Sequence, residues 1–286
     1  MATAQLPPEG MNLLQPDVTT DEEVARFREF YSYAKKEQNK SYEFWLEFRP
    51  DVVKRHKLRT ATRTTGPDFP LPALAALHQY VIDAFDDGIG YEIELARTMG
   101  ARRSDVLDTI SVAFIHSGHP GMYLVSRRAE ALRSYAEPQE ADRFPPDWSF
   151  DPHAFDSGMD FSVLEATPQD LRSLTDWYER TAGEVPKGVR FLARHRPDLL
   201  KAYRNRYEHA ISQSLPAQML PYLLLHHNAV RGFRDGIREN VLLGKALGMT
   251  RPQLLNAICQ AELHAGAEVF DVVAEAAGDV LATVPE

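Results

Sequence analysis

Two stretches of this chain repeat each other, and the repeat constrains the fold more than any other feature of the sequence. Residues 85–118 align without a gap with residues 233–266, at an offset of 148, and 12 of the 34 aligned positions are identical. Shorter matches continue upstream at an offset of 147, as between the Arg-Pro-Asp motifs at residues 49–51 and 196–198. Solenoid units are roughly 20–50 residues long. A period this long therefore indicates the tandem duplication of a whole domain.

The repeat divides the chain into four parts. We expect an N-terminal arm over residues 1–18, a first repeat over 19–136, a linker over 137–160 and a second repeat over 161–286. The arm and the linker are rich in proline, and neither shows a helical period. The two copies can then be compared with each other: a polar residue present in only one copy is a candidate for specialised chemistry.

Composition excludes several classes of partner. The net charge of −9 argues against nucleic acid and anionic membranes, which both bind basic surfaces. No apolar run approaches the roughly 18–20 residues of a membrane-spanning helix, and we see no basic-then-apolar signal at the N-terminus. The single cysteine, Cys259, excludes an intramolecular disulfide. We therefore expect a cytoplasmic protein with two ordinary hydrophobic cores.

Both copies are predicted to be entirely helical. Apolar residues recur at helical spacing, and no segment alternates with the period of a strand. Capping motifs predict helix starts at Thr20 and Thr167. Further predicted boundaries are a break at Arg49-Pro50 with an Arg–Asp pair in both copies, a helix start at Leu71, a kink or break at residues 86–88, a helix end at Gly100, a helix from Ser104 to Gly118 and a last helix from Pro120.

Residues 88–118 resemble the carboxymuconolactone decarboxylase / alkylhydroperoxidase D-like superfamily. The similar pattern is a helix with Ala96 and Gly100, a second helix beginning near Ser104, and a His-x-Gly motif at His116. The second copy repeats it with Gly244, Gly248 and His264, among other residues. The resemblance implies two tandem alkylhydroperoxidase D-like domains in an all-α fold. It also implies a homo-oligomer, because members of this superfamily assemble from several subunits.

The departures from that family disfavour a thiol peroxidase. Peroxidase members carry a C-x-x-C-x-x-x-H motif, and the matching positions here are Phe85, Gly88 and Glu92. Disulfide-based peroxidases need a reactive thiolate with a resolving partner, which a single cysteine does not supply. The resemblance then implies the decarboxylase branch, which uses neither metal nor organic cofactor. We expect acid/base chemistry on a small carboxylated or keto substrate, with a decarboxylase, lyase or isomerase step.

The candidate site residues come mainly from the first copy, because the copies differ at Glu92/Asn240 and at His119/Ala267. Acid/base chemistry needs one group that stabilises enolate charge and another that moves a proton. The predicted catalytic residues are Glu92, His116, His119 and His78. The predicted substrate-binding residues are Tyr91, Trp45, Asp87, His226 and His264. Glu92 and His78 are 14 residues apart, so they can meet only if the chain turns back between them or another subunit supplies one of them.

Simpler roles remain open for each of these residues. Asp87 can cap a helix, His78 and His116 can be satisfied core histidines, and Glu92 can lie on a solvated face. A metal held by His116 and His119, or by His226 and His227, with a nearby carboxylate is a weaker alternative, and we expect none. The competing function is a non-catalytic oligomeric scaffold or a small-molecule binding protein of the same fold. An enzyme would bring Glu92 and a histidine together at one pocket, whereas a scaffold would disperse or pair them.

Overall fold

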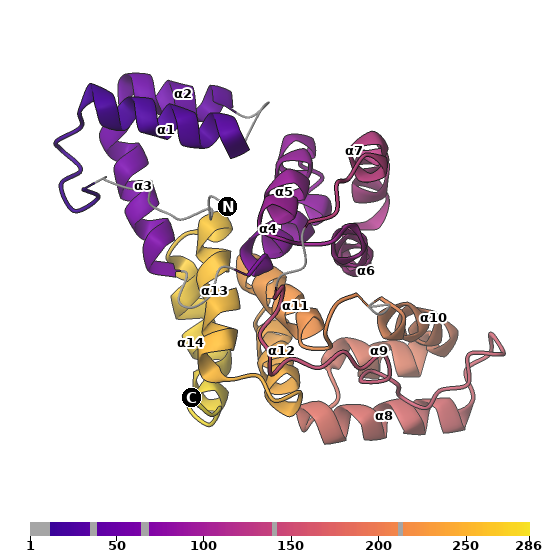
Figure 1. Ribbon diagram of the computed structural model, residues 1–286. Helices are drawn as coiled ribbons and strands as arrows, with labels where there is room; N and C mark the ends of the chain where they lie inside the picture. Colours follow the sequence, from indigo (N-terminus) through magenta and orange to yellow (C-terminus); the bar gives the residue numbers. More distant parts are fainter. Residues whose placement is uncertain (1–11, 35–38, 64–68, 139–141, 211–213) are drawn as a thin grey trace.

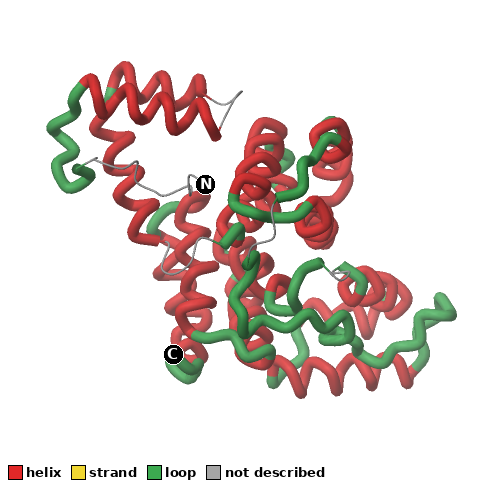
Figure 2. Tube along the Cα trace, in the orientation of Figure 1, coloured by secondary structure: helices red, strands yellow, loops and turns green. Residues whose placement is uncertain are grey.

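The computed structural model describes residues 12–34, 39–63, 69–138, 142–210 and 214–286. Within these ranges the chain forms helices and loops and no strand (Figure 2), which confirms the all-α prediction. The helices are α1 (Asp21–Ala34), α2 (Asn39–Phe48), α3 (Pro50–Arg63), α4 (Leu71–Ile82), α5 (Asp86–Thr98), α6 (Arg103–Ser126), α7 (Ala129–Arg133), α8 (Pro168–Ala182), α9 (Lys187–His195), α10 (Pro197–Glu208), α11 (Met219–Val230), α12 (Arg234–Ala246), α13 (Arg251–Ala265) and α14 (Glu268–Leu281). No described helix is both long and apolar enough to cross a membrane.

The boundaries of the helices follow the sequence repeat. Helices α4, α5 and α6 begin 148 residues before α11, α12 and α13, since 219 − 71, 234 − 86 and 251 − 103 all equal 148. Helices α1 and α3 begin 147 residues before α8 and α10, since 168 − 21 and 197 − 50 both equal 147. The chain therefore builds the same succession of helices twice.

Local interactions explain most of these boundaries. The Thr20 amide donates to the Glu23 carboxylate at 3.1 Å, and the Glu23 amide donates to the Thr20 hydroxyl at 3.2 Å. Thr167 and Asp170 form the same reciprocal cap at the start of α8. Both predicted caps are therefore confirmed. The prediction for Ser104 was wrong, because α6 begins one residue earlier and the Asp105 carboxylate accepts the Arg102 amide at 2.8 Å instead.

The chain turns sharply between α4 and α5. Helix α4 ends at Ile82, and Ala84 has a φ of 53°, in the left-handed region that non-glycine residues rarely adopt. The equivalent residue of the second repeat is Gly232, with a φ of 63°. The predicted break thus occurs a few residues before Asp86, and it folds α5 back against α4. Further along, Gly118 kinks α6 just before Pro120, at the point where the sequence predicted that one helix ends and the next begins.

The Arg49–Asp51 pair is present in the first repeat only. The Arg49 guanidinium donates two hydrogen bonds of 2.8 Å to the Asp51 carboxylate, at the break between α2 and α3. In the second repeat Asp198 instead accepts the amide of Ala166 at 3.1 Å. The prediction of one brace shared by both copies was therefore wrong for the second, because there the Asp side chain holds the segment just before α8.

One hydrophobic core unites most of the chain. It extends from Leu71 in α4 to Val284 near the C-terminus and includes Phe144, Trp148 and Phe155 of the linker region. Helices α1–α3 have a small core of their own, made by Phe27, Leu46 and Val53. In Figure 1, α1–α3 and α8–α10 lie at opposite ends of the molecule. Helix α3 contacts α13 and α10 contacts α6, so each repeat packs its third helix against the other repeat.

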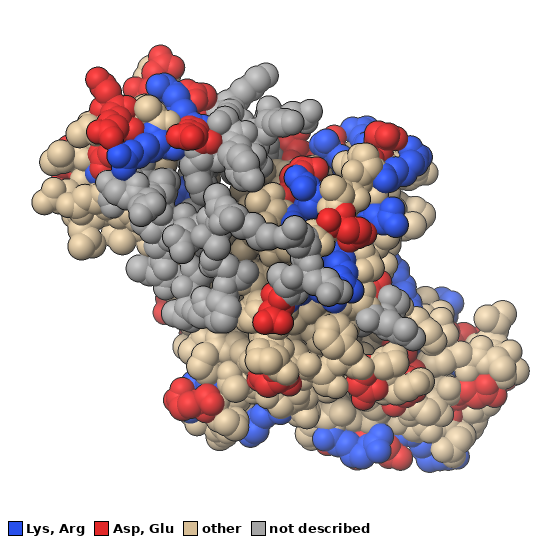
Figure 3. All heavy atoms as spheres, in the orientation of Figure 1, with Lys and Arg blue, Asp and Glu red and all other residues tan. Residues whose placement is uncertain are grey.

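Helices α4 and α11 meet at the centre, where equivalent residues of the two repeats touch each other. Gln79 contacts His227, and Asp83 forms an ion pair with Arg231, and both pairs join positions 148 residues apart. Contacts between equivalent positions are the signature of a two-fold interface. The two repeats are thus arranged as the subunits of a symmetric dimer would be. On the face shown in Figure 3, basic and acidic side chains are interspersed over the described surface.

Candidate functional site at the junction of the two repeats

Five of the ten histidines gather where the two repeats meet. They come from four helices: His78 from α4, His116 from α6, His226 and His227 from α11, and His264 from α13. The sequence singled out four of them as site residues. The fifth, His227, was considered only as a possible metal ligand, because its equivalent Gln79 is not a histidine, and the contact between the two shows how they are connected.

His227 lies at the centre of one half of this histidine cluster. Its ring stacks on that of His116, with centroids 4.9 Å apart and an interplanar angle of 25°. It meets the ring of His78 edge-on at 6.0 Å. Its Nδ1 lies 3.0 Å from the Gln79 Oε1, an acceptor, so we assign the proton to Nδ1. Gln79 therefore fixes the orientation of the ring.

His264 lies in the other half of the cluster and connects it to Tyr80. The His226 and His264 rings meet edge-on with centroids 5.2 Å apart. The Tyr80 ring approaches His264 at 5.1 Å and an angle of 69°. Because Tyr80 belongs to α4 and His264 to α13, this contact crosses from one repeat to the other. Tyr80 thus lies at the boundary of the first repeat, in contact with His264 of the second.

Burial keeps the centre of the cluster uncharged. His78 and His226 are fully buried, and this burial lowers the pKa of both far below 6.5, with neighbouring histidines adding to the shift. The backbone of Gln260 acts in the opposite direction on His226. Burial also lowers the pKa of His227 to about 3. The ring nitrogens of His78 and His226 make no hydrogen bond of normal geometry with a described residue, so protonation would place unpaired charge in the core.

His116 and His119 occupy different environments. The His116 side chain is exposed except for the face that stacks on His227. Desolvation by the surrounding protein lowers its pKa, and the positive charge of Arg206 lowers it further. His119 is exposed and follows the kink at Gly118. Among the described residues no three His, Cys, Asp or Glu side chains gather in a way that could hold a metal ion. The spacing of His116 and His119 therefore does not produce a metal site in this part of the chain.

Glu92 is buried on α5 and faces the tyrosines of the first repeat. Only 5% of this residue is exposed to solvent. Burial raises the pKa of Tyr80 and of Tyr91, and the negative charge of Glu92 is the next contribution for both hydroxyls. The turn at Ala84 makes this possible, because it brings α5 back along α4. Glu92 of the first repeat thus acts electrostatically on Tyr80, and His264 of the second repeat packs against the Tyr80 ring.

The remaining predicted site residues lie outside the group formed by Glu92, Tyr80 and His264. Asp87 is exposed in the first turn of α5, where the N-cap residue is Phe85. Trp45 is 41% exposed on α2 and packs edge-on against Phe44. Asn240, the counterpart of Glu92, is buried and donates a 2.8 Å hydrogen bond to the Gly236 carbonyl within its own helix. The structure therefore does not bring Asp87 and Trp45 together with the histidine cluster.

A charged pair closes one side of the junction. Arg59 on α3 forms an ion pair of 3.1 Å with Glu262 on α13, two residues before His264. Arg206 occupies the equivalent position of the second repeat, since 206 − 59 = 147, and acts on His116 of α6. An arginine of each repeat thus reaches the helix of the other repeat that carries the His-x-Gly motif.

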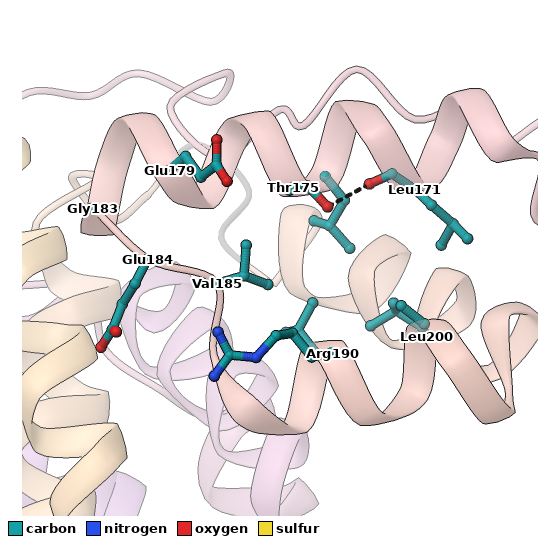
Figure 4. A pocket seen from close by; sticks show the side chains of 11 residues that line it. Leu171, Thr175, Glu179, Gly183, Glu184, Val185, Arg190 and Leu200 are labelled. Carbon is teal, nitrogen blue, oxygen red and sulfur yellow. Dashed lines mark hydrogen bonds between the residues drawn. The ribbon is translucent and has the colours of Figure 1, made fainter.

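Two cavities of the described chain lie away from this junction. One of about 540 Å³ lies among α8, α9 and α10, and is shown in Figure 4. The other, of about 620 Å³, is lined by Arg102 and by residues 142–150 of the linker region. Neither is lined by a residue that the sequence assigned to the site. In comparisons with family models, curated proteins and solved structures, nothing matches this chain.

Proposed function

We propose that this chain is a cofactor-free acid/base enzyme that acts on a small carboxylated or keto compound at the junction of its two repeats. The observation that carries the proposal is the convergence on Tyr80. Glu92 of the first repeat acts on it electrostatically, and His264 of the second repeat packs against its ring. A carboxyl group, a phenol and an imidazole are side-chain groups that can carry out proton transfer to and from carbon.

The division of labour follows from the chemistry of each group. Tyr80 keeps its proton at neutral pH, because burial raises its pKa, and its hydroxyl can donate a hydrogen bond to developing enolate charge. Glu92 exchanges the proton with carbon. In a decarboxylation, the bond to the carboxylate breaks and carbon dioxide leaves, and the electrons of that bond pass into the enolate. Glu92 takes up a proton from solvent and delivers it to the carbon, where it forms the new C–H bond. His264 orients the phenol ring.

The proposed fold assignment is a tandem pair of alkylhydroperoxidase D-like domains. Its support is the repeated succession of helices at offsets of 147 and 148, together with the His-x-Gly motif in both copies. A homo-oligomer in a reducing cytoplasm is part of the same proposal. The only cysteine is Cys259, so a disulfide-forming peroxidase has no pair of thiols within one chain.

The substitution Glu92→Gln tests the function. A panel of small lactone carboxylates and β-keto acids first identifies a substrate by release of carbon dioxide or loss of ultraviolet absorbance. We expect Glu92→Gln to lower kcat by roughly 10²–10⁴-fold at an unchanged melting temperature, because the proton donor is lost but the shape is kept. Asp87→Asn, on the exposed face of the same helix, is the matched control and should keep full activity. Undiminished turnover by Glu92→Gln would rule out this site.

The second candidate is a non-catalytic scaffold or small-molecule binding protein. It is favoured by the burial of His78 and His226 and by the position of both described cavities away from Glu92. This alternative predicts saturable binding of a small molecule, or a defined oligomer by mass photometry, with no turnover of any member of the panel.

A further inference from the structure

The cavity among α8, α9 and α10 is a feature that the proposed function does not use. Its volume is about 540 Å³, and most of its walls are aliphatic. Figure 4 shows Leu171 and Thr175 on α8 facing Arg190 on α9 and Leu200 on α10, with Val185 between them. A cavity of this size with mainly apolar walls matches the general character of small-molecule sites.

The first repeat shows that this space is not required by the fold. In α1–α3 the equivalent region is filled by a small core of Phe27, Leu46 and Val53, with two half-buried residues packed against it. All five residues correspond, at an offset of 147, to residues that line the cavity in the second repeat. The pairs are Val24/Leu171, Phe27/Leu174, Tyr42/Val189, Leu46/Ala193 and Val53/Leu200.

The differences between these pairs account for the space. Phe27 and Tyr42 are replaced by the aliphatic Leu174 and Val189, so two rings are lost. Leu46 is replaced by Ala193, which removes most of a third side chain. The exchanges at Leu171 and Leu200 add only one methylene each. Apolar cores are normally filled to high density, so the smaller side chains of the second copy leave room at positions where the first copy has larger ones.

The charges at the cavity define the polar part of the ligand. Arg190 forms no ion pair and no side-chain hydrogen bond with any described residue. In Figure 4 Glu184 turns its carboxylate away from the other lining side chains, and its charge acts on Arg238. Glu179 belongs to α8, across the cavity from Arg190. The Thr175 hydroxyl donates to the Leu171 carbonyl within its own helix. The guanidinium of Arg190 is therefore the charged group that a ligand would meet on the α9 side of the cavity.

We propose that this cavity of the second repeat binds a small apolar carboxylate, such as a medium-chain fatty acid, with its chain between α8 and α10 and its carboxylate at Arg190. The site is independent of the chemistry proposed at Glu92. Its two determinants are the apolar space left by Leu174, Val189 and Ala193 and the unpaired guanidinium.

Calorimetric titration of the full-length protein with decanoate and with decanol tests both determinants. We expect one saturable decanoate site per chain. The variant Ala193→Leu, and the triple variant Leu174→Phe/Val189→Tyr/Ala193→Leu, restore the residues of the first repeat. They should weaken binding of both probes by roughly tenfold or more, because the displaced apolar contact is lost, while the melting temperature is maintained or raised.

Charge variants separate the two determinants. Arg190→Ala should weaken decanoate by roughly two- to fivefold, as expected for one exposed ion pair, and leave decanol unchanged. Arg194→Ala, on the same helix but outside the cavity, and Glu179→Gln should not weaken decanoate. The proposal is overturned if decanoate shows no saturable binding to the wild-type chain. It is equally overturned if Ala193→Leu binds both probes as well as the wild type, and the carboxylate assignment fails if Arg190→Ala affects decanol and decanoate alike.

Discussion

At the scale of single residues, the close approach of α6 to α4 depends on Gly121. A Cβ atom at this position would overlap the backbone carbonyl oxygen of Val81 and would lie 2.9 Å from the Ser117 Cβ. A backbone atom cannot rotate away as a side chain can. The two helices would therefore have to separate to accommodate any larger residue at this point.

We expect Gly121→Ala to lower the free energy of unfolding by about 1–3 kcal/mol, the usual effect of overpacking. The matched control is Gly278→Ala in α14, where an added Cβ would meet no atom within 4 Å. That variant should raise stability by about 0.5–1 kcal/mol, because alanine favours helix more than glycine does. Urea unfolding at pH 7.5 measures both. Equal stabilities for the two variants would contradict the packing argument.

The sequence predicted residues whose roles are local and missed those whose roles depend on a distant partner. The caps at Thr20 and Thr167 and the kink at Gly118 depend only on neighbours in the chain, so local patterns predicted them correctly. The place of His227 in the cluster became visible only through its contact with Gln79, 148 positions away. Likewise Ala193 looks like an ordinary helical residue until the filled core of the first repeat gives it a comparison.

At the scale of elements, a buried ion pair attaches the linker region to α10. Arg204 and Glu208 lie one turn apart at 2.7 Å and are both buried. The guanidinium also donates to the Phe155 carbonyl at 2.5 Å and packs 3.9 Å above the Trp177 ring. Glu208 in turn accepts the Ser157 amide at 3.1 Å. This network therefore holds residues 155–157 against the second repeat.

We expect Arg204→Met to lower the free energy of unfolding by about 3–5 kcal/mol, because it leaves the Glu208 charge buried without its partner. The double variant Arg204→Met/Glu208→Leu should recover most of that loss, since it removes both charges together. Thermal unfolding measures the stability. Hydrogen exchange should report faster opening at residues 155–157 in Arg204→Met. If the single variant proves as stable as the double, the pair has no such role.

The predicted order of helices was largely correct, because helical periodicity and capping are encoded within each element. The pairing of elements between the repeats could not be derived in the same way. The contacts of α3 with α13 and of α10 with α6 depend on how the two copies dock, and no local pattern specifies this. The candidate site has the same limit. Glu92 was identified within its copy, but its relation to Tyr80 depends on the turn at Ala84, and the approach of His264 depends on docking.

At the scale of the whole molecule, the histidine cluster makes the joining of the repeats sensitive to acid. His78, His226 and His227 all have pKa values lowered from 6.5 by burial. Above pH 6.5 these rings are neutral in both the folded and the unfolded chain. As the pH falls below 6.5, the unfolded chain takes up protons that the folded chain does not, so stability decreases. Each ring contributes up to about 1.4 kcal/mol per pH unit.

Glu239 acts in the opposite direction over part of this range. Burial raises its pKa from 4.5 to about 7, although the positive charge of Arg204 opposes the shift. Between these values the folded chain binds the proton and the unfolded chain does not, so the contribution of Glu239 to stability grows as the pH falls. A measurement on the wild type alone would therefore combine both effects, and a difference between variants is needed to isolate a histidine.

The variant His227→Gln isolates one member of the cluster, because it places a glutamine opposite Gln79 and so makes the central contact symmetric. Its free energy of unfolding should fall less steeply with acid than that of the wild type, by about 1.4 kcal/mol per pH unit below pH 6, since one depressed pKa is removed. Titrating groups remote from His227, including Glu239, cancel in this difference. Urea unfolding at pH 7.5, 6.0 and 5.0 measures it. Because His227 has a pKa of about 3, the difference in unfolding free energy between variant and wild type should still be growing at pH 5. Parallel pH profiles for His227→Gln and the wild type would show that this ring is not held neutral in the folded protein.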